Sequence, residues 1–348
     1  RPTHTAVSYP AGRARLEGPV GVSGVPSPPR AEPDRQACPR CEGETYLTLF
    51  RASDRLYRTT EQRFHVVACS DCGLVRLHPR PDPAELARFY PRTYWWEADN
   101  SASGRLAEMY RRFVLGDHVR FVASSLDGLA PVLDVGCGGG SFLHALGKPA
   151  QATVGLDSSQ TAASAAHANY RLPAVCGSVP HHPFRPGSFG AVTLFHVLEH
   201  VSDPRACLLA IRDALIPEGK LFLQVPNADC WQFLLLGSRW SGLDVPRHLI
   251  HFRAKDLENL LADCGFEVVR RKFFSLRDNP AGLATSLCPQ LEPVSRRVRT
   301  IKESNAARLL KDLLYLALVS AAVPFTLLEA ASERGSTITV EAVRRGET

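Results

Sequence analysis

Residues 132–142 read VLDVGCGGGSF, an apolar run that leads directly into a glycine-rich turn and a helix-forming segment. Val and Leu in succession favour a buried strand. Four of the five positions after Val135 are glycine, and glycine allows backbone conformations and close approaches that a Cβ atom would block. The stretch therefore predicts a strand, a turn and a helix, with a ligand able to press against the turn.

An acid follows the next apolar run. Residues 152–156 read ATVGL and are followed by Asp157, about 20 residues beyond the glycines. A carboxylate in this place can accept hydrogen bonds from both hydroxyls of a ribose. Together, the turn and the acid predict a cofactor that contains a nucleoside.

Apolar runs and helical segments alternate from residue 131 to about residue 274. This alternation predicts an α/β fold in which helices cover both faces of a parallel sheet. Residues 275–335 break the pattern with helical sequence that contains several prolines, and we expect them to form an insertion before the last strand. Strands are expected near 132–136, 152–156, 173–176, 190–196, 219–225 and 266–273, with a last one at 336–343.

Four of the ten cysteines form two closely spaced pairs, Cys38 with Cys41 and Cys69 with Cys72. Two C-x-x-C turns deliver four soft ligands at chelating distance, as a tetrahedral zinc ion requires. Four unrelated buried thiols are the less favoured interpretation. Because cysteine fills all four positions, the predicted zinc is structural and not catalytic. Ten cysteines are too few for a disulfide scaffold in 348 residues, so we expect a reducing compartment.

In its glycine-rich turn and in the acid after its second strand, the chain resembles the class I S-adenosylmethionine-dependent methyltransferases. Their first motif reads D-x-G-x-G-x-G and their second strand ends in an acid, as residues 134–140 and Asp157 do here. The resemblance covers about residues 130–274 and the last strand, and it implies a Rossmann-like seven-stranded sheet. Ser178 stands where the family usually has an acid that meets the adenine, and Asp134 is expected to position the turn or the methionine amine. The resemblance implies that S-adenosylmethionine is bound by Asp134, Gly136, Gly138, Gly140, Asp157, Ser178 and His196.

A narrower resemblance concerns methyltransferases with an N-terminal zinc ribbon, which read C-P-x-C and then C-x-x-C-G-L-V. This chain has CPRC at 38–41 and CSDCGLV at 69–75, followed by a P-R-P segment and an aromatic stretch at 94–96. The resemblance implies a small-molecule or glycan acceptor, and we expect methylation of a hydroxyl on a sugar, a cell-surface glycan precursor or a specialised metabolite. The expected layout is a disordered tail (1–35), the zinc ribbon (36–81), a helical linker (82–128) and the methyltransferase domain (129–348).

Two histidine-containing segments supply candidates for catalysis. Residues 196–200 read HVLEH, and residues 244–252 read DVPRHLIHF. Methyl transfer to oxygen needs removal of the acceptor proton, and a histidine with a pKa of about 6.5 is suited to that task. We take His248 as the first candidate base and His200 as the second, and Glu199 is a further candidate catalytic residue.

The segment HVLEH allows three interpretations. A zinc-protease helix of the H-x-x-E-H type is disfavoured, because Pro204 and the two residues before it predict the start of a new helix. A divalent-cation site at His196, Glu199 and His200 would be similar to the E-x-x-E-H segment of ubiquinone-pathway O-methyltransferases. The favoured interpretation is that these side chains line a pocket without a metal.

Charge is distributed unevenly along the chain. The net charge is +6 overall, with +3 in residues 1–60, −2 in residues 61–269 and +5 in residues 270–348. The predicted catalytic part therefore offers no basic surface for phosphates, and nucleic acid is a disfavoured partner. Two alternatives stay open: an RNA methyltransferase that uses the ribbon to grip phosphate, and a non-enzymatic interaction module with a degenerate fold. No secretion signal is recognised, and we expect a cytoplasmic protein.

An apolar stretch near the C-terminus indicates a further contact surface. Residues 313–328 span 16 residues and include Pro324, which is short for the ~20 residues of a membrane-spanning helix. Basic residues lie just before this stretch. A lid over the active site is the favoured interpretation, with a homodimer contact or shallow contact of residues 296–328 with the inner face of the membrane as alternatives.

Overall fold

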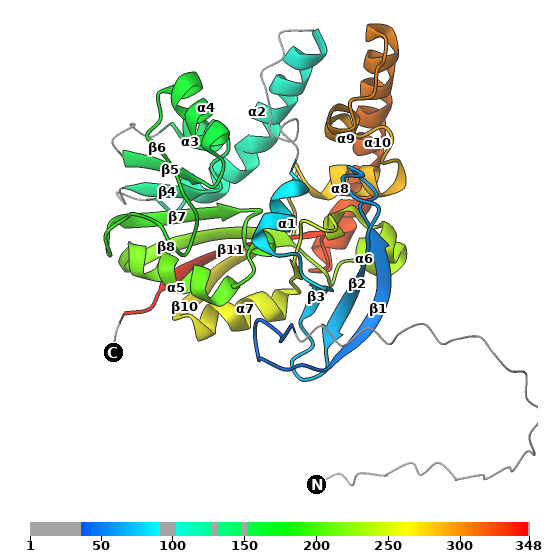
Figure 1. Ribbon diagram of the computed structural model, residues 1–348. Coiled ribbons are helices and arrows are strands. Elements are labelled where there is room, and N and C mark those ends of the chain that lie inside the picture. The colour runs from blue at the N-terminus through cyan, green and yellow to red at the C-terminus, as the bar shows by residue number, and fades with distance from the viewer. Residues whose placement is uncertain (1–35, 91–101, 127–130, 148–151, 347–348) are drawn as a thin grey trace, which may run out of the picture. The chain divides into compact units, whose positions relative to one another are not determined.

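The computed structural model describes residues 36–90, 102–126, 131–147 and 152–346 (Figure 1). The expected tail at 1–35 and the aromatic stretch at 94–96 lie outside the described residues. The described residues belong to one compact unit. They form a seven-stranded sheet with helices, a four-stranded sheet and a helical insertion.

The larger sheet has the order β10 (Phe266–Lys272), β11 (Thr337–Arg344), β8 (Leu215–Pro226), β7 (Phe189–Phe195), β4 (Val132–Val135), β5 (Thr153–Asp157) and β6 (Ala174–Cys176). Neighbouring strands from β8 to β6 are parallel, whereas β11 runs antiparallel to both β8 and β10. All seven predicted strands are present. The predicted α/β fold with a Rossmann-like seven-stranded sheet is therefore confirmed.

Two layers of helices cover the larger sheet (Figure 1). One layer holds α2 (Ala102–Ala123), α3 (Ser141–Leu146) and α4 (Gln160–Tyr170), and the other holds α5 (Pro204–Ala214) and α7 (Ala254–Asp263). Buried apolar side chains of both layers pack on the sheet. Because β4, β5 and β7 are parallel, the loops that follow them open at one edge, where open α/β sheets bind their ligands.

The smaller sheet combines two distant parts of the chain. β1 (Tyr46–Ser53), β2 (Arg63–Cys69) and β3 (Val75–His78) come from the expected ribbon, and β9 (Ile250–His251) adds to its edge as an antiparallel strand. The sequence does not reveal this addition, because two residues carry no readable period. As a result, the ribbon sheet ends directly beside the segment that contains His248.

Short helices complete the framework around these sheets. They are α1 (Pro83–Arg88), η3 (Leu198–His200), α6 (Trp231–Leu236), η4 (Gly237–Arg239) and η5 (Ser241–Leu243).

The insertion is helical, as expected, but its last helix is longer than predicted. α8 (Asn279–Leu287), α9 (Pro293–Val298) and α10 (Asn305–Ala331) follow one another between β10 and β11. α10 has 27 residues and continues through Pro324. By length and composition alone this helix is apolar enough to cross a membrane, whereas the sequence analysis considered only the 16-residue apolar stretch within it. The helix is longer than the apolar stretch because its first turns, which begin at Asn305, are polar.

Candidate functional site

The glycine turn after β4 holds the carboxylate of Asp157 through the backbone. The amide of Gly138 donates to Asp157 Oδ2 over 2.9 Å, and the amide of Ser159 donates to Oδ1 over 2.8 Å. Asp157 is buried, and burial raises its pKa. The carboxylate is therefore fixed beside the turn at the end of β5, where a ribose would need it.

The glycines of the turn serve two purposes. Gly136, Gly138 and Gly140 all have positive φ angles, of 74°, 52° and 80°. A Cβ at Gly136 would lie 2.5 Å from Val197 Cγ2, and a Cβ at Gly140 would lie 2.8 Å from Leu172 Cδ1. A Cβ at Gly138 or at the following glycine would meet no described atom within 4 Å. Packing thus requires the outer glycines, while the inner two border open space in which a ligand can lie against the backbone.

Asp134 and Ser178 lie near the turn in different surroundings. Asp134 is buried, and the hydroxyl of Thr193 in β7 donates to its Oδ1 over 2.6 Å. Burial raises the pKa of Asp134 to about 7. Ser178 is exposed in the loop after β6, and that loop is joined to β5 by the 2.9 Å bond from Gly177 N to Asp157 O. The predicted cofactor residues of the turn, Asp157 and Ser178 thus share one edge, while Asp134 contacts the neighbouring strand.

His196 comes directly after β7 and is held between two carboxylates. Its Nδ1 lies 3.1 Å from Glu199 Oε1, and its Nε2 lies 3.4 Å from Asp278 Oδ2. Burial opposes the charged form, but the carboxylates of Asp278 and Glu199 raise the pKa of His196 to about 9. Asp278 is the residue before α8. The ion pair therefore ties the helical insertion to the end of β7.

Glu199, His200 and His248 bring their side chains together near the same strand end. One ligating atom from each lies within 4.8 Å of the other two. His248 Nδ1 lies 2.8 Å from the carbonyl of Gly242 and donates to it, so in the neutral imidazole the lone pair is on Nε2. Glu199 is completely buried, and its Oε2 has no hydrogen-bond partner among the described residues. Side chains of these types at these distances can receive a proton or a cation.

The charge states of this cluster follow from burial and from its neighbours. Burial, assisted by His248, lowers the pKa of His200 to about 4, which keeps His200 neutral at pH 7. Burial works against ionisation of Glu199, but the hydrogen bond from His196 holds its pKa well below the usual range. A neutral imidazole near a carboxylate can accept a proton and hold the resulting charge.

The grouping corrects one detail of the sequence analysis. The cation interpretation named His196 together with Glu199 and His200, whereas the structure brings His248 to the other two instead. His196 is engaged by the two carboxylates described above. The single turn of η3 also provides no long helix for the H-x-x-E-H interpretation, in agreement with the prediction that a new helix begins at Pro204.

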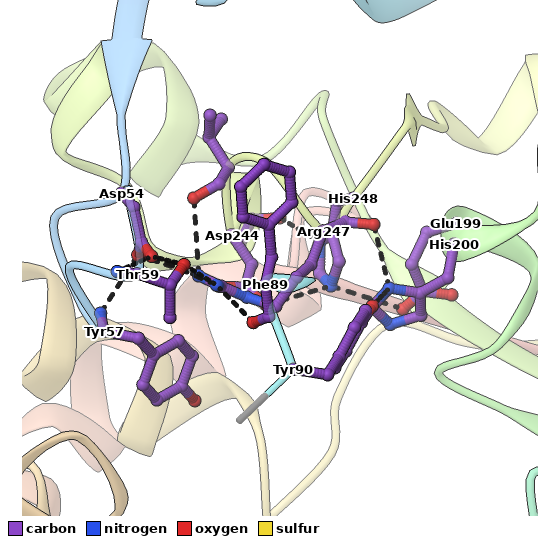
Figure 2. Close-up of polar contacts among 12 residues, drawn as sticks. Asp54, Tyr57, Thr59, Phe89, Tyr90, Glu199, His200, Asp244, Arg247 and His248 are labelled. Carbon is purple, nitrogen blue, oxygen red and sulfur yellow. Dashed lines mark hydrogen bonds and ion pairs between the residues drawn. The ribbon is translucent and has the colours of Figure 1, made fainter. Parts of the chain in front are cut away.

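A buried arginine next to this cluster reaches the ribbon (Figure 2). The side chain of Arg247 is fully buried and contacts Asp54 with two nitrogens, Nη2 to Oδ1 at 2.8 Å and Nη1 to Oδ2 at 3.1 Å. It also contacts Asp244 (Nη2 to Oδ1, 2.8 Å) and the carbonyl of Phe89 (3.3 Å). The carbonyl of Arg247 lies 3.0 Å from His200 Nδ1. Arg247 thus links the ribbon, the end of α1 and a candidate base.

Backbone bonds make a second connection between the ribbon and the cluster. The amide of Leu77 in β3 donates to the carbonyl of Leu249 over 2.9 Å, and the amide of Leu249 donates to the carbonyl of Glu199 over 2.8 Å. The hydroxyl of Tyr90 lies 2.9 Å from His200 Nδ1 (Figure 2). The site is therefore assembled from both sheets.

His118 is a residue that the sequence analysis missed. It lies in α2 and is 3% exposed, with neither ring nitrogen hydrogen-bonded within the described parts of the chain. Its ring meets Phe195 edge-on at 4.9 Å, and its Nε2 lies 3.9 Å from Asp278 Oδ2. Burial lowers the pKa of His118 to about 4. A single histidine in a helix gives no sequence signal, so only the fold reveals this neutral imidazole beside the end of β7.

The four paired cysteines form a compact sulfur cluster. Cys38 Sγ lies 3.6 Å from Cys72 Sγ, Cys41 Sγ lies 3.5 Å from Cys69 Sγ, and all four sulfurs lie within 4.8 Å of one another. Gly73 follows the second pair with a φ of 73°. Four thiolates in a tetrahedral arrangement fit a zinc ion with no open position. The predicted ligands are thus brought together as a structural site requires.

Comparisons with known proteins agree with this geometry. A family model described as a methyltransferase domain matches residues 106–271. The ubiquinone biosynthesis O-methyltransferase of Idiomarina loihiensis is 31% identical over 166 residues, which cover 44% of this chain and 65% of that protein. The protein of the same name from Xanthomonas campestris pv. campestris (strain B100) is 31% identical over 170 residues, which cover 46% of this chain and 68% of that protein.

The chain is also similar to a solved structure, a SAM-dependent methyltransferase from Archaeoglobus fulgidus. The two are 15% identical with a TM-score of 0.45, over 70% of this chain and 100% of that one. The match to the Xanthomonas relative spans more than two thirds of that protein, and the larger sheet has the seven strands that the sequence resemblance implied. The chain belongs to the class I S-adenosylmethionine-dependent methyltransferases.

Proposed function

We propose that this protein is an O-methyltransferase that moves the methyl group of S-adenosylmethionine to a hydroxyl. The observation that carries the proposal is the position of the cluster formed by Glu199, His200 and His248. The glycine turn follows β4, the cluster follows β7, and these strands are parallel neighbours. A cofactor on the turn and an acceptor at the cluster would therefore meet at the same edge of the sheet.

The residues of the turn fit S-adenosylmethionine, which supplies a methyl group on a positively charged sulfur when bound. Asp157 would accept hydrogen bonds from the ribose hydroxyls, since the backbone already orients its carboxylate. Gly138 and the glycine after it would lie against the cofactor, because the space beside them is open. Ser178 would lie near the adenine, and Asp134 would hold the end of β4 against β7.

His248 is the proposed general base. Its Nδ1 is held by the carbonyl of Gly242, so its Nε2 can take the proton from the acceptor hydroxyl. The acceptor oxygen then bonds to the methyl carbon as the carbon–sulfur bond breaks, and the electron pair of that bond stays on the sulfur. Glu199 Oε1, 3.9 Å from His248 Nε2, would stabilise the resulting imidazolium. His200 is the second candidate base, and alignment of the two reactants supplies most of the acceleration.

The same three residues also fit a divalent cation. Glu199 Oε2 lacks a hydrogen-bond partner among the described residues, and nitrogen and carboxylate ligands suit such an ion. A cation held by Glu199, His200 and His248 would polarise the acceptor oxygen and lower its pKa. Loss of activity in a chelator, restored by a divalent cation other than zinc, would support this second arrangement.

The acceptor proposed is a small hydroxylated molecule such as a sugar, a glycan precursor or a specialised metabolite. The relatives reported above are named ubiquinone biosynthesis O-methyltransferases, which supports oxygen as the methylated atom. RNA is a weaker candidate because residues 61–269 carry a net charge of −2. A non-enzymatic role would require loss of cofactor binding, yet the turn and Asp157 are intact.

Two further parts of the proposal concern the setting of the reaction. We place the enzyme in the cytoplasm, where a cluster of four reduced cysteines is stable. Those cysteines would hold a zinc ion whose task is to fold the ribbon, since no ligand position would be left for a substrate.

The test is a transfer assay with methyl-labelled S-adenosylmethionine and fractionated cell extract. We expect label in a small hydroxylated metabolite or a glycan, and label in RNA instead would overturn the acceptor class. His248→Ala should lower the rate by about 10²–10⁴-fold while binding of S-adenosylhomocysteine is kept. His181→Ala, which changes an exposed histidine, is the matched control. Equal rates for both variants would remove His248 from the mechanism.

A further inference from the structure

We propose that the exposed apolar face of α10 is a docking surface for the anionic leaflet of a lipid bilayer. This α10 face is formed by Leu310, Leu313, Leu314, Leu327 and Leu328, whose side chains are between 48% and 64% exposed. Their spacing puts them on one side of a helix, and Ala317, Ala321 and Pro324 continue the stripe between them. Figure 1 shows the first part of α10 projecting away from the seven-stranded sheet beside α9, and its later part running past α8 toward β11.

The opposite face of α10 is fixed to the protein. Val319, Ala322, Thr326 and Glu329 are buried. The hydroxyl of Tyr315 lies 2.8 Å from Thr285 Oγ1 in α8. The amide and side chain of Gln232 in α6 donate to the two oxygens of Glu329 over 2.9 and 2.8 Å. The leucines therefore point outward from a helix whose orientation is set by these contacts.

The charged residues just before the α10 face favour a negatively charged partner. No charged residue occurs between positions 313 and 328, but six basic residues and two acidic ones occur between 296 and 312. Both acids are engaged by ion pairs: Glu303 with Arg296 and Lys311, and Asp312 with Arg296. The basic excess at one end of an apolar face is the pattern that binds anionic lipid.

The helix would lie on the bilayer and not cross it. By length and composition alone the helix could cross a bilayer, and only 22% of its most apolar 18 residues is buried in the protein. However, β11 begins at Thr337, shortly after the helix ends, and pairs on both sides within the larger sheet. The buried carboxylate of Glu329 is also held inside the protein. The helix cannot leave these contacts, so only its outer face is available to the acyl chains.

This inference uses no residue of the catalytic cluster, so it stands or fails separately from the proposed function. It would give the enzyme access to acceptors attached to lipids, and it replaces the lid interpretation of the sequence analysis for the outer face of the helix.

The experiment is co-sedimentation of the full chain with vesicles of phosphatidylcholine alone and of phosphatidylcholine with phosphatidylglycerol. Leu310→Asp/Leu314→Asp is the test variant. Leu47→Asp is the control, since Leu47 is 66% exposed on β1 and outside the α10 face. We expect binding to the phosphatidylglycerol vesicles, a loss of at least ~10-fold in the test variant, and none in the control. Binding should also weaken at high salt.

Three outcomes would overturn the proposal. They are no sedimentation with either vesicle, equal binding of the test variant and the wild type, and equal binding to both kinds of vesicle. A concentration-dependent dimer in gel filtration that the test variant loses, without vesicle binding, would assign the face to a second copy of the chain. Unchanged melting temperatures of both variants show that the comparison is made on folded protein.

Discussion

Replacing Arg247 by methionine should lower the free energy of unfolding by about 3–5 kcal/mol. Arg247 and Asp54 have side chains with no exposed surface, and their contact is bidentate. Without the guanidinium, the carboxylate of Asp54 stays buried with no opposite charge. A buried ion whose partner is removed costs far more than the net stabilisation that the intact pair contributes.

The neighbours of Asp54 show why the charge cannot simply be solvated. Its oxygens accept hydrogen bonds from the amides of Tyr57 (3.0 Å) and Thr59 (2.8 Å). Burial raises the pKa of Asp54, but the contact with Arg247 outweighs burial and holds the pKa below its usual value. In Arg247→Met this support is lost, so the carboxyl must take up a proton at higher pH. The variant should therefore regain part of its stability as the pH falls.

The assay is urea unfolding of the zinc-loaded protein at pH 7, followed by tryptophan fluorescence. Asp54→Asn should cost less than Arg247→Met, and the double variant should cost less than the sum of both by about 1–3 kcal/mol. Arg247→Lys keeps the charge but loses the planar double contact, so its loss should be intermediate. Arg88→Met, an exposed change in α1, should stay within about 0.5 kcal/mol.

Two results would refute this reasoning. The first is a loss below about 1 kcal/mol for Arg247→Met, which would mean that water reaches Asp54. The second is additivity of the two single variants, which would mean that the side chains do not interact in solution.

Three other predictions concern the cofactor turn, the buried aspartate and the sulfur cluster. Gly138→Ala should lower the free energy of unfolding by about 1–2 kcal/mol because Gly138 has a left-handed backbone, and it should weaken S-adenosylhomocysteine binding at least ~10-fold in calorimetry. Gly136→Ala should lower the free energy of unfolding more, because its Cβ meets Val197. Equal affinity of Gly138→Ala and the wild type would contradict the open space beside Gly138. The pKa of Asp134 is raised from 3.8 to about 7, so its contribution to stability is complete below pH ~4 and is lost as the pH rises through 7. Asp134→Asn should remove this loss, which is on the order of 4 kcal/mol in full and about 3 kcal/mol between pH 5 and pH 8.5. Urea midpoints that fall equally in both proteins between these two pH values would speak against it. Removal of zinc by a chelator should lower the melting temperature and also the transferase activity, with recovery on adding zinc; an unchanged melting temperature would mean that the cysteines hold no metal.

The cofactor half of the site was readable from the sequence because its signals are local. The apolar run before Gly136 and the acid at 157 are each contained in a few consecutive residues. A strand, a turn and the end of the next strand then follow from the periodicity of the chain. For the same reason all seven strands of the larger sheet could be predicted within a few residues.

The acceptor half was only partly readable because it depends on contacts between distant residues. Arg247 and Asp54 are 193 positions apart, and no local pattern pairs them. His118 reaches the end of β7 only through the packing of α2 on the sheet. The candidate bases were found because they lie in short polar segments after strands, whereas their grouping with Glu199 needed the fold.

The pairing of β9 with β3 has a consequence for how this protein can be recombined. Leu249 and Ile250 are almost completely buried, and their backbone partners lie in β3 and at Glu199. A shortened chain that starts at residue 82 would uncover these residues and leave the edge of the site without its hydrogen-bonding partner. A chimaera that takes its ribbon from a relative would therefore also need that relative's counterpart of residues 247–251. The segments to be exchanged are thus not contiguous in the gene.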